Sequence, residues 1–360
     1  MRDNNVLLFR VDASIQMGTG HVMRCLALAQ AWLYEGGEAY FCTGEGFPIA
    51  LDRRLSVEGV KRIELQRVAN MEEDAETTIS YCRRYHSSWL VVDGYHFDAN
   101  YQQRIKAAGL QLLVIDDYGH ADRYEADFVL NQNISANANL YPRIASYTQL
   151  LMGCKYALLR REFWAWRDEV RYQLRSQPPS SKLRILVTLG GSDPNNTTMT
   201  VLEALKELDL NRLNVKVIVG GSNPHLDPIK AIVDRFGDSV SLYFDVTQMP
   251  ELMAQSDLAI AAGGSTCWEL ALLGVPALLI VLAENQSAIA KKLDELKVGI
   301  NLGEYQHVTP HLIAQKIAEL LQDLDRLTAM SQKALELVDG YGSNRTIKWM
   351  RLRVNHAEAR

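Results

Sequence analysis

Residues 6–34 read VLLFRVDASIQMGTGHVMRCLALAQAWLY, and this stretch decides the fold. Its first part, Val6–Val11, is an apolar run that predicts a buried strand. Its last part, His21–Tyr34, has apolar residues at helical spacing and predicts a helix. The glycines at 18 and 20 between them favour a tight turn, because glycine adopts backbone angles that other residues avoid. Strand, glycine-rich loop and helix in this order are typical of a parallel α/β sheet.

The second half of the chain repeats this order. An apolar run over Leu183–Thr188 predicts a strand, segment 189–195 (LGGSDPN) is rich in glycine, and Thr197–Glu207 has helical spacing. Strand-like and helical patterns alternate through both halves. The alternation predicts an α/β fold with a doubly wound parallel sheet in each half. Two such domains facing a central cleft bind ligands at the carboxyl ends of their strands.

The domain boundaries follow from a change of composition near the middle of the chain. Segment 173–182 (QLRSQPPSSK) is polar and holds two adjacent prolines, as expected of a linker. We therefore expect an N-terminal domain over 1–172, a C-terminal domain over 183–342, and a C-terminal helix over 343–360 whose return to the N-terminal domain is open. Within the N-terminal domain we expect Phe128–Leu130 to be the last short strand and Tyr156–Tyr172 to be helical.

The composition is that of a globular protein with enough apolar residues for two cores. Of the 360 residues, 48% are hydrophobic and 22% are charged, which excludes a disordered or collagen-like chain. The net charge of −5 disfavours a nucleic-acid-binding protein. The five cysteines are scattered singly, which is typical of reduced thiols in a cytoplasmic protein and not of a zinc site. No apolar run reaches the roughly 18 residues of a membrane span, and neither a metal nor an organic cofactor is expected.

Three joints between a strand and a helix are rich in glycine. The second and third contain Gly190, Gly191, Ser192, Gly263, Gly264, Ser265 and Thr266. Backbone N–H groups and the helix dipole at such joints attract phosphate, so a diphosphate site is favoured over plain tight turns. None of the joints matches GxxxxGK[ST] or a complete GxGxxG, so neither a P-loop nor a nicotinamide site is indicated. Glu269, on the helix after the third joint, either accepts both hydroxyls of a ribose or caps the helix.

Polar side chains at the joints of the first half are candidates for chemistry. His21 closes the first joint, where the helix dipole disfavours an imidazolium, so it is either a general base or a cap that binds an anion. Asp12 and Asp93 each end a strand, and such acids either bind sugar hydroxyls or cap the next helix. Asn131 opens the amide-rich segment 131–133, which suits hydrogen bonds to a ligand or forms a solvated turn.

Eight short motifs point to a family. In chain order they are RVDAS (10–14), GTGHVMRC (18–25), VDGY (92–95), IDD (115–117), LNQN (130–133), LGGSD (189–193), AGGSTCWE (262–269) and ENQ (284–286). Together they resemble the UDP-2,4-diacetamido-2,4,6-trideoxy-β-L-altropyranose hydrolases of pseudaminic acid biosynthesis, which also occur under the name of spore-coat polysaccharide proteins. The resemblance extends from about residue 6 to about residue 350, with Val11 standing where alanine is expected. The GTGHVMRC segment is quite specific, whereas GGST…E is shared with other UDP-sugar enzymes, including the glycosyltransferase that makes lipid II.

The resemblance implies a GT-B architecture of two Rossmann-like domains, with the nucleotide held mostly by the C-terminal one. It implies that water attacks the anomeric carbon of a UDP-amino sugar without a metal, that UDP leaves and that the configuration inverts. In this reading His21 activates the water, and Tyr95 and Asn285 place the water and the sugar. The two C-terminal glycine loops hold the diphosphate, Glu269 the ribose and the backbone around Met249 the uracil. The residues expected to bind the substrate are Asp12, Gly20, Arg24, Asp93 and Asn131.

Three other functions fit the same residues. A GT-B glycosyltransferase would use the same UDP site with a hydroxyl acceptor. A UDP-amino-sugar 2-epimerase would need acids near the sugar C2, which Asp93, Asp116 and Asp117 can supply. A non-catalytic protein that binds sugar nucleotides would use His21 only as an anion-binding cap. In each case the partner is a small UDP-amino sugar; the oligomeric state is open, with a monomer favoured.

Overall fold

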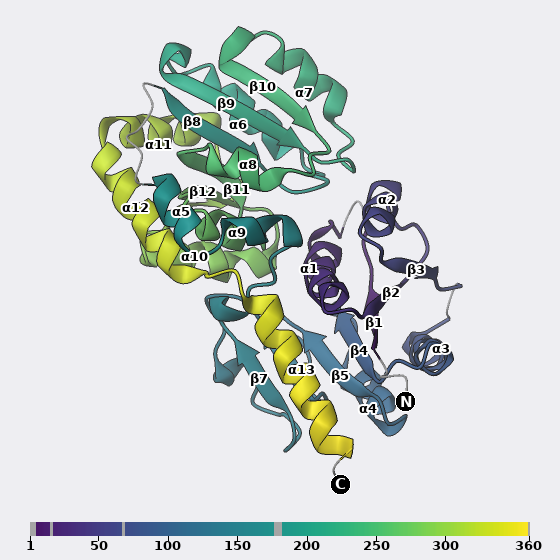
Figure 1. The fold of residues 1–360 in the computed structure, drawn as a ribbon. Helices are drawn as coiled ribbons and strands as arrows, with labels where there is room; N and C mark the ends of the chain where they lie inside the picture. Colours follow the sequence, from purple (N-terminus) through teal and green to yellow (C-terminus); the bar gives the residue numbers. More distant parts are fainter. Residues whose placement is uncertain (1–4, 15–16, 67–68, 176–181, 359–360) are drawn as a thin grey trace. The chain divides into compact units, whose positions relative to one another are not determined.

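The chain folds into two compact units (Figure 1), each built on one parallel sheet. The computed structural model describes residues 5–14, 17–66, 69–175 and 182–358. Unit 1 comprises Met1–Arg161 together with Tyr341–Arg360, and unit 2 comprises Glu162–Gly340.

The sheet of unit 1 has the strand order β3-β2-β1-β4-β5-β6-β7. The strands are β1 (Val6–Val11), β2 (Glu38–Thr43), β3 (Lys61–Glu64), β4 (Trp89–Asp93), β5 (Gln111–Ile115), β6 (Phe128–Asn131) and β7 (Gln149–Met152). Every neighbouring pair is parallel, with Val11 opposite Asp93 where β1 meets β4. The central strands are buried on both faces, which explains why they are continuous apolar runs.

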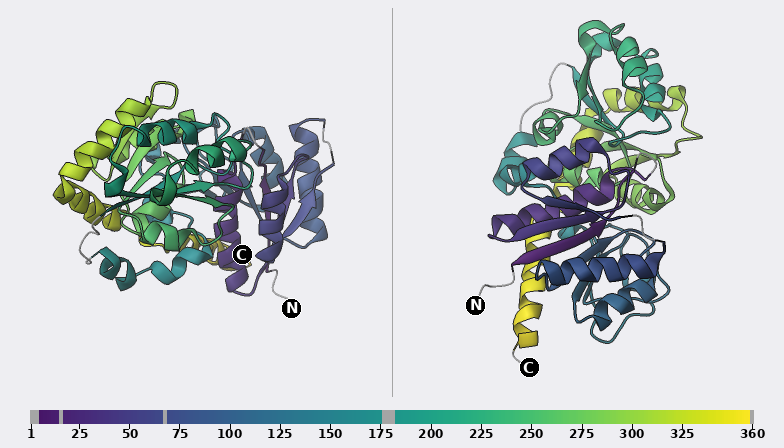
Figure 2. Two further views of the ribbon diagram at one scale, coloured as in Figure 1. Left: turned by 90° about the horizontal axis from the view of Figure 1, so that it is seen from above. Right: turned by 90° about the vertical axis from the view of Figure 1, so that its right-hand side faces the viewer.

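Helices connect these strands in two directions from the centre of the sheet. The helices of unit 1 are α1 (Gly20–Tyr34), α2 (Ile49–Val57), α3 (Met71–Arg84), α4 (Ala99–Ala107), α13 (Gly342–Glu358) and the short 3-10 turns η1 (Ala138–Leu140) and η2 (Cys154–Tyr156). The chain runs outward through α1 and α2 and returns through α3 and α4, so right-handed crossovers place the two pairs on opposite faces. Helix α13, yellow in Figure 2, packs against α1 and η2.

Unit 2 repeats the doubly wound plan with the order β10-β9-β8-β11-β12-β13, again parallel throughout. Its strands are β8 (Leu183–Thr188), β9 (Leu213–Val219), β10 (Val240–Phe244), β11 (Leu258–Ala262), β12 (Ala277–Val281) and β13 (Gly299–Glu304). Its helices are α5 (Glu169–Arg175), α6 (Thr197–Leu205), α7 (Leu226–Val233), α8 (Met249–Ala254), α9 (Thr266–Leu272), α10 (Ser287–Glu295), α11 (Pro310–Gln322) and α12 (Leu324–Leu337). Four 3-10 turns, η3 (Arg161–Trp166), η4 (Leu210–Arg212), η5 (Gly237–Ser239) and η6 (Glu284–Gln286), complete the element order.

Two expectations for the N-terminal half are wrong. Phe128–Leu130 is not the last strand, because β7 follows and pairs with β6. Segment 156–172 is not one helix but two short turns and the start of α5. The helix is interrupted because side chains from elsewhere bind its backbone: Gln132 Oε1 accepts from Leu158 N at 2.8 Å, and Gln30 Oε1 accepts from Arg161 N at 2.7 Å.

The division of the chain also differs from the expected boundary. Unit 1 ends at Arg161 and not at residue 172, and η3 and α5 belong to unit 2. The reason is packing, because α5 contacts α12 and the Arg171 guanidinium donates to the carbonyl of Val338, both within unit 2. Most of the proposed linker, residues 176–181, lies outside the described residues. Among the helices that the structure describes, none combines the length and the hydropathy needed to cross a bilayer.

Candidate active site

The site of unit 1 lies where the sheet changes direction, at the carboxyl ends of β1, β4 and β5. From β1 the chain continues to α1 and from β4 to α4, which cover opposite faces, so the loops after these strands diverge. Asp12 follows β1, Asp93 ends β4, and Asp117 lies two residues beyond β5. Because parallel strands end at one edge, three residues far apart in sequence come together there.

His21 lies in the first turn of α1 and bonds to the end of β4. Its Nδ1 is 2.7 Å from Asp93 Oδ1, and its side chain is 12% exposed while that of Asp93 is fully buried. Burial raises the pKa of Asp93, but the Arg24 guanidinium and His21 lower it by more, so the carboxyl is ionised. A carboxylate can only accept, so Nδ1 carries a proton, and in the neutral imidazole Nε2 presents its lone pair. This is the tautomer that a general base requires.

Arg24 lies one turn further along α1 and joins two carboxylates. Its Nε and Nη2 donate to Asp93 at 2.6 and 2.7 Å, and its Nη1 donates to Asp117 Oδ1 at 2.7 Å. Arg24 is 6% exposed, so the guanidinium is enclosed by these partners. Arg24 and Asp93 are both expected from the sequence to bind the substrate. In the structure they are bonded to each other, and Asp93 also contacts His21.

Tyr95 completes this group from the loop after β4. Its hydroxyl donates to Asp117 Oδ2 at 2.6 Å. Its ring meets that of His21 edge to face, with centroids 5.2 Å apart and an interplanar angle of 76°. The exposed ring of Tyr118 follows, 5.0 Å from Tyr95 between centroids. Two of the three expected catalytic residues, His21 and Tyr95, are therefore neighbours in unit 1.

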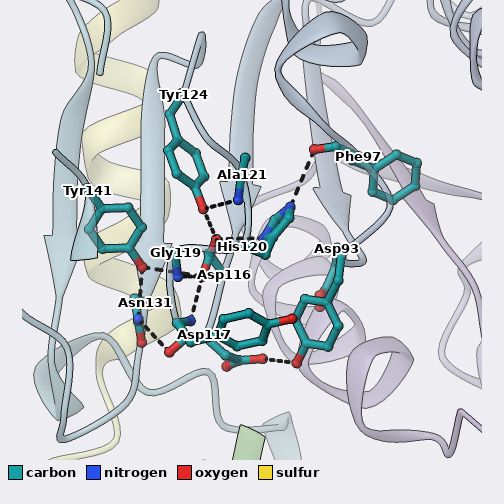
Figure 3. Close-up of polar contacts among 12 residues, drawn as sticks. Asp93, Phe97, Asp116, Asp117, Gly119, His120, Ala121, Tyr124, Asn131 and Tyr141 are labelled. Atoms are coloured by element: carbon teal, nitrogen blue, oxygen red, sulfur yellow. Dashed lines mark hydrogen bonds and ion pairs between the residues drawn. The ribbon is translucent and has the colours of Figure 1, made fainter. Parts of the chain in front are cut away.

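Asp116 organises the loop after β5 (Figure 3). Its carboxylate accepts from the backbone N–H of Tyr118 and Gly119, from His120 Nδ1 and from the hydroxyl of Tyr124. Burial raises the pKa of Asp116, but the bonds from His120 and Tyr124 and the backbone lower it to about 2. The same Asp116–His120 pair raises the pKa of His120 despite its burial. Asp116 thus fixes the turn that carries Asp117 and Tyr118.

Asn131 lies below the surface of the site. Its Nδ2 donates to the carbonyl of Asp117 at 3.0 Å and to the hydroxyl of Tyr141 at 2.8 Å (Figure 3). Its Oδ1 accepts from Asn133 N. Asn133 Nδ2 in turn donates to Asp117 Oδ1 at 2.7 Å. The amide-rich segment therefore supports the loop after β5, and Asn131, expected to bind the substrate, has no exposed surface in this structure.

Asp12 has a second cluster of its own on the other side of the switch point. Its Oδ1 accepts from Arg10 Nη1 and from Gly44 N, both at 2.6 Å, and its Oδ2 lies 3.6 Å from His96 Nε2. The Asp12 side chain keeps 21% of its surface, so it can still reach a ligand. Burial lowers the pKa of His96, and Asp12 offsets this only in part, so His96 is neutral at neutral pH. Gly20, expected to bind the substrate, is the first residue of α1 and has open space around it.

In unit 2, the loop after β8 carries Gly190, Gly191 and Ser192. Gly190 has φ +92°, and Ser192 is 4% exposed. Asp193 accepts from the backbone N–H of Thr197 and Thr198 at 2.9 Å, so the first turn of α6 is already capped by a carboxylate. Any anion bound here would contact the loop backbone and not the end of α6.

The loop after β11 carries Gly263, Gly264, Ser265 and Thr266, and it leads into α9 without a side-chain cap. A Cβ at Gly263 would lie 3.1 Å from the carbonyl oxygen of Gln286, so the loop packs closely against the turn η6. Asn285 belongs to that turn. The third expected catalytic residue is thus beside the second glycine loop within unit 2.

The remaining nucleotide-binding expectations also fall in unit 2. Glu269 is partly buried on α9, and Met249 is 8% exposed at the start of α8. The loops after β8 and β11 flank the switch point of this sheet, where ligands of doubly wound sheets bind. Within the described residues no group of three or more His, Cys, Asp or Glu side chains is arranged as metal ligands.

Comparison with known proteins finds a family match in the second half of the chain. Residues 184–341 match the glycosyltransferase family 28 C-terminal domain. They contain both glycine loops of unit 2, together with α8, α9 and η6.

Three curated relatives match longer stretches at low identity. The chain is 26% identical to an uncharacterised protein of Methanocaldococcus jannaschii over 76% of its own length and 55% of that protein, and 28% identical to a spore coat polysaccharide biosynthesis protein of Bacillus subtilis over 54% and 56%. The chain thus spans about half the length of these two relatives. It is 24% identical to the UDP-2,4-diacetamido-2,4,6-trideoxy-β-L-altropyranose hydrolase of Campylobacter jejuni over 79% of the chain and 94% of that protein.

Solved structures confirm the expected fold class. MurG of Acinetobacter baumannii superposes with a TM-score of 0.68 at 17% identity, covering 96% of this chain and 99% of that one. A UDP-N-acetylglucosamine 2-epimerase-like protein of Listeria monocytogenes gives a TM-score of 0.65 at 14% identity, covering 95% and 94%. Residues 184–341 therefore match the glycosyltransferase family 28 C-terminal domain, and the chain as a whole has the GT-B fold and is similar to a UDP-diacetamido-trideoxy-altropyranose hydrolase.

Proposed function

We propose that the protein hydrolyses a UDP-linked diacetamido-trideoxy sugar at its anomeric carbon, with inversion, and releases UDP and the free amino sugar for nonulosonic (pseudaminic) acid biosynthesis. The observation that carries the proposal is the His21–Asp93 pair, which holds an imidazole at the start of α1 with Nε2 as acceptor. The name of the Campylobacter relative, which the chain matches over 94% of that protein's length, supports the choice of substrate.

The proposed reaction balances without a further reactant. His21 Nε2 takes a proton from water while the water oxygen forms a bond to the anomeric carbon. The bond between that carbon and the diphosphate oxygen breaks, and its electron pair leaves with UDP. Asp93 stabilises the imidazolium that forms, because its buried carboxylate accepts from Nδ1 at 2.7 Å. The proton then passes to solvent or to the departing diphosphate.

Unit 2 is proposed to hold UDP. The backbone of the loops at Gly190–Ser192 and Gly263–Thr266 would bind the diphosphate, and Glu269 would accept the ribose hydroxyls. The family 28 domain, which covers both loops, supports this assignment. Backbone N–H donors at the diphosphate stabilise the charge that develops on the leaving group.

A UDP-dependent glycosyltransferase is the second candidate, and the family 28 domain favours it. In that case His21 would deprotonate an acceptor hydroxyl in place of water. The 2-epimerase has less support, because the acids it would need at the sugar C2 are engaged in the protein. Asp93 binds Arg24 and His21, Asp116 binds its own turn, and Asp117 binds Arg24 and Tyr95.

The decisive experiment is hydrolysis in H₂¹⁸O. The protein is incubated with a panel of UDP-amino sugars, EDTA and no acceptor, and the products are analysed by mass spectrometry. We expect the label in the free sugar and unlabelled UDP, because water attacks carbon. Label in a phosphate fragment would mean attack at phosphorus and would contradict the mechanism. Release of UDP only after an acceptor is added would identify a transferase.

The variant His21→Ala tests the assignment of the general base, because it separates UDP binding from turnover. We expect UDP affinity, measured by calorimetry, to stay within about twofold of the unsubstituted protein, because the nucleotide loops are in unit 2. We expect turnover to fall by a factor on the order of 10²–10⁴, the usual contribution of a general base. An alanine variant with undiminished turnover would remove His21 from the mechanism.

A further inference from the structure

Asp93, Arg24 and Asp117 form a buried layer next to His21 and Tyr95, the two side chains of unit 1 that are expected to contact water and sugar. Asp117 Oδ2 accepts the hydroxyl of Tyr95 at 2.6 Å, and Asp117 Oδ1 accepts Arg24 Nη1 at 2.7 Å. Arg24 also holds Asp93, the partner of His21. Arg24, Asp93 and Asp117 are each at most 8% exposed, so solvent screens their charges little. One guanidinium therefore links the support of His21 to the support of Tyr95.

The hydrogen bond to Asp117 decides how Tyr95 can interact with a ligand. A phenol has one proton, and this proton is donated to a carboxylate that can only accept. The pKa of Asp117 is lowered, because Arg24 and Tyr95 outweigh the effect of burial, so the carboxylate is ionised. Any further hydrogen bond at the Tyr95 oxygen is then one that the oxygen accepts. A donor such as a water O–H or an amide N–H fits this position, and a carbonyl does not.

The same layer has an unbalanced charge. Asp93 and Asp117 contribute two negative charges and Arg24 one positive charge, so the layer carries one net negative charge when His21 is neutral. Protonation of His21 cancels it. The other groups facing this region are His96, Asp12 and Arg10 beyond His21, Cys25 against Asp93, and the Asp116–His120 pair beside Tyr95. Burial raises the pKa of Cys25, so it stays neutral and leaves the charge of the layer unchanged.

We propose that Asp117 is a positioning residue of this site, which acts through Tyr95 and Arg24 and touches no substrate. It turns the Tyr95 hydroxyl so that the oxygen accepts a hydrogen bond from the attacking water, and it supplies the negative charge that stabilises His21 once it has taken the proton. The inference rests on the proposed function for its catalytic readout, but its structural part concerns the protein without substrate.

Asp117→Asn is a sharp test because the structure fixes the orientation of the new amide. Two donors, Arg24 Nη1 and Asn133 Nδ2, face Oδ1, so the amide oxygen must occupy that position. The amide NH₂ then faces Tyr95 and donates to it, which reverses the hydroxyl. The variant also removes one negative charge. Asp127→Asn is the matched control, because Asp127 is a buried, ion-paired carboxylate of unit 1 that binds Lys106 and Leu112 N and neither Arg24 nor Tyr95.

The first readout is the titration of His21 by NMR in the protein without substrate. We expect its midpoint to fall by about one pH unit in Asp117→Asn and to stay in place in Asp127→Asn, since removal of a nearby negative charge disfavours the imidazolium. An unchanged midpoint in Asp117→Asn would overturn the charge relation. This measurement does not depend on activity, so it separates failure of the inference from failure of the proposed function.

The second readout is a double-mutant cycle on turnover with Tyr95→Phe. We expect Asp117→Asn to lower kcat on the order of tenfold with little change in KM. We expect a smaller loss in the Tyr95→Phe background, where no hydroxyl remains to be turned and only the loss of the negative charge near His21 is felt. Equal losses in both backgrounds would overturn the positioning role. If Asp117→Asn does not fold, the unsubstituted protein is examined by proton NMR. A slowly exchanging hydroxyl proton that is lost in Tyr95→Phe supports the hydrogen bond from Tyr95 to Asp117, and the absence of such a proton refutes it.

Discussion

At the scale of single residues, two adjacent aspartates show how one strand end serves both architecture and chemistry. Asp116 bonds to its own turn and to three aromatic or imidazole side chains, whereas Asp117 bonds to Arg24 and Tyr95. The sequence shows both as acids at the end of a strand and does not distinguish them. The two roles differ because the two carboxylates point in different directions. The Asp116 carboxylate points into the turn and accepts from the backbone N–H of Gly119.

The lowered pKa of Asp116 predicts a loss of folding stability in acid. Its pKa is about 2 in the folded protein against 3.8 for the free side chain, so the ionised form stabilises the fold. This contribution, roughly 2 kcal/mol, is fully present above about pH 4 and is lost as the pH falls toward 2. We expect the difference in stability between the unsubstituted protein and Asp116→Asn, from hydrogen exchange of β5 amides, to shrink over that window. A difference that is the same at pH 6 and pH 2 would contradict the assignment.

The residue scale is also where sequence reasoning reaches its limit. His21 was recognisable because the glycines and the helix start lie beside it in the sequence. Sequence reasoning expects Arg24, Asp93 and Asn131 to bind the substrate. In the structure all three are buried and hydrogen-bonded to other residues of unit 1. Their partners lie 69, 93 and 14 residues away, and such contacts leave no local pattern.

At the scale of elements, the loop after β8 depends on a neighbour that no motif identified. A Cβ at Gly220, which follows β9, would lie 2.5 Å from the Cα and the carbonyl oxygen of Gly191. Both atoms belong to backbone and cannot rotate away as a side chain can. The two loops therefore touch only because Gly220 lacks a side chain. Local patterns predicted the central strands of both sheets and the helices that begin at the glycine-rich joints. They missed elements such as β3, α3 and β13, and they failed at β7 and at 156–172, where pairing and side-chain bonds from other elements decide.

Gly220→Ala tests the assignment of the loop after β8. The added methyl must displace the Gly190–Ser192 backbone, so we expect UDP to bind about tenfold more weakly, a loss of roughly 1.4 kcal/mol. Ser222→Ala, two residues along in the same turn, removes a hydroxyl without a backbone clash and should bind UDP normally. Calorimetric titration with UDP measures both. Equal affinity of Gly220→Ala and the unsubstituted protein would show that the diphosphate does not contact this loop.

At the scale of the whole molecule, unit 1 is built from both ends of the chain and unit 2 from its middle. Helix α13 contributes Ile347 and Met350, both fully buried, to unit 1 and packs against α1, the helix that carries His21 and Arg24. The presence of a parallel α/β sheet in each half followed from the alternation of patterns along the sequence. The sequence leaves open whether the C-terminal helix returns to unit 1, because an amphipathic helix does not by itself reveal which surface it covers. In the structure this helix belongs to unit 1.

Met350→Ala tests the contribution of this helix. Loss of a fully buried methionine side chain costs about 2–5 kcal/mol, and the cost should fall on unit 1 alone. We expect faster hydrogen exchange in α1 and unchanged exchange in β11. Leu352→Ala is the control on the same helix, since Leu352 is 44% exposed and its loss should change little. Equal acceleration in both units would mean that they unfold as one.

The placement of α13 also has a consequence for how the protein is made. A ribosome releases residues in sequence order, and domains generally fold as units as they emerge. Unit 2 is complete once Gly340 has left the ribosome, whereas unit 1, although begun first, lacks α13 until Tyr341–Arg360 follows. During synthesis unit 2 is therefore finished before the unit that carries His21, and the face of α1 that α13 covers stays exposed throughout that interval.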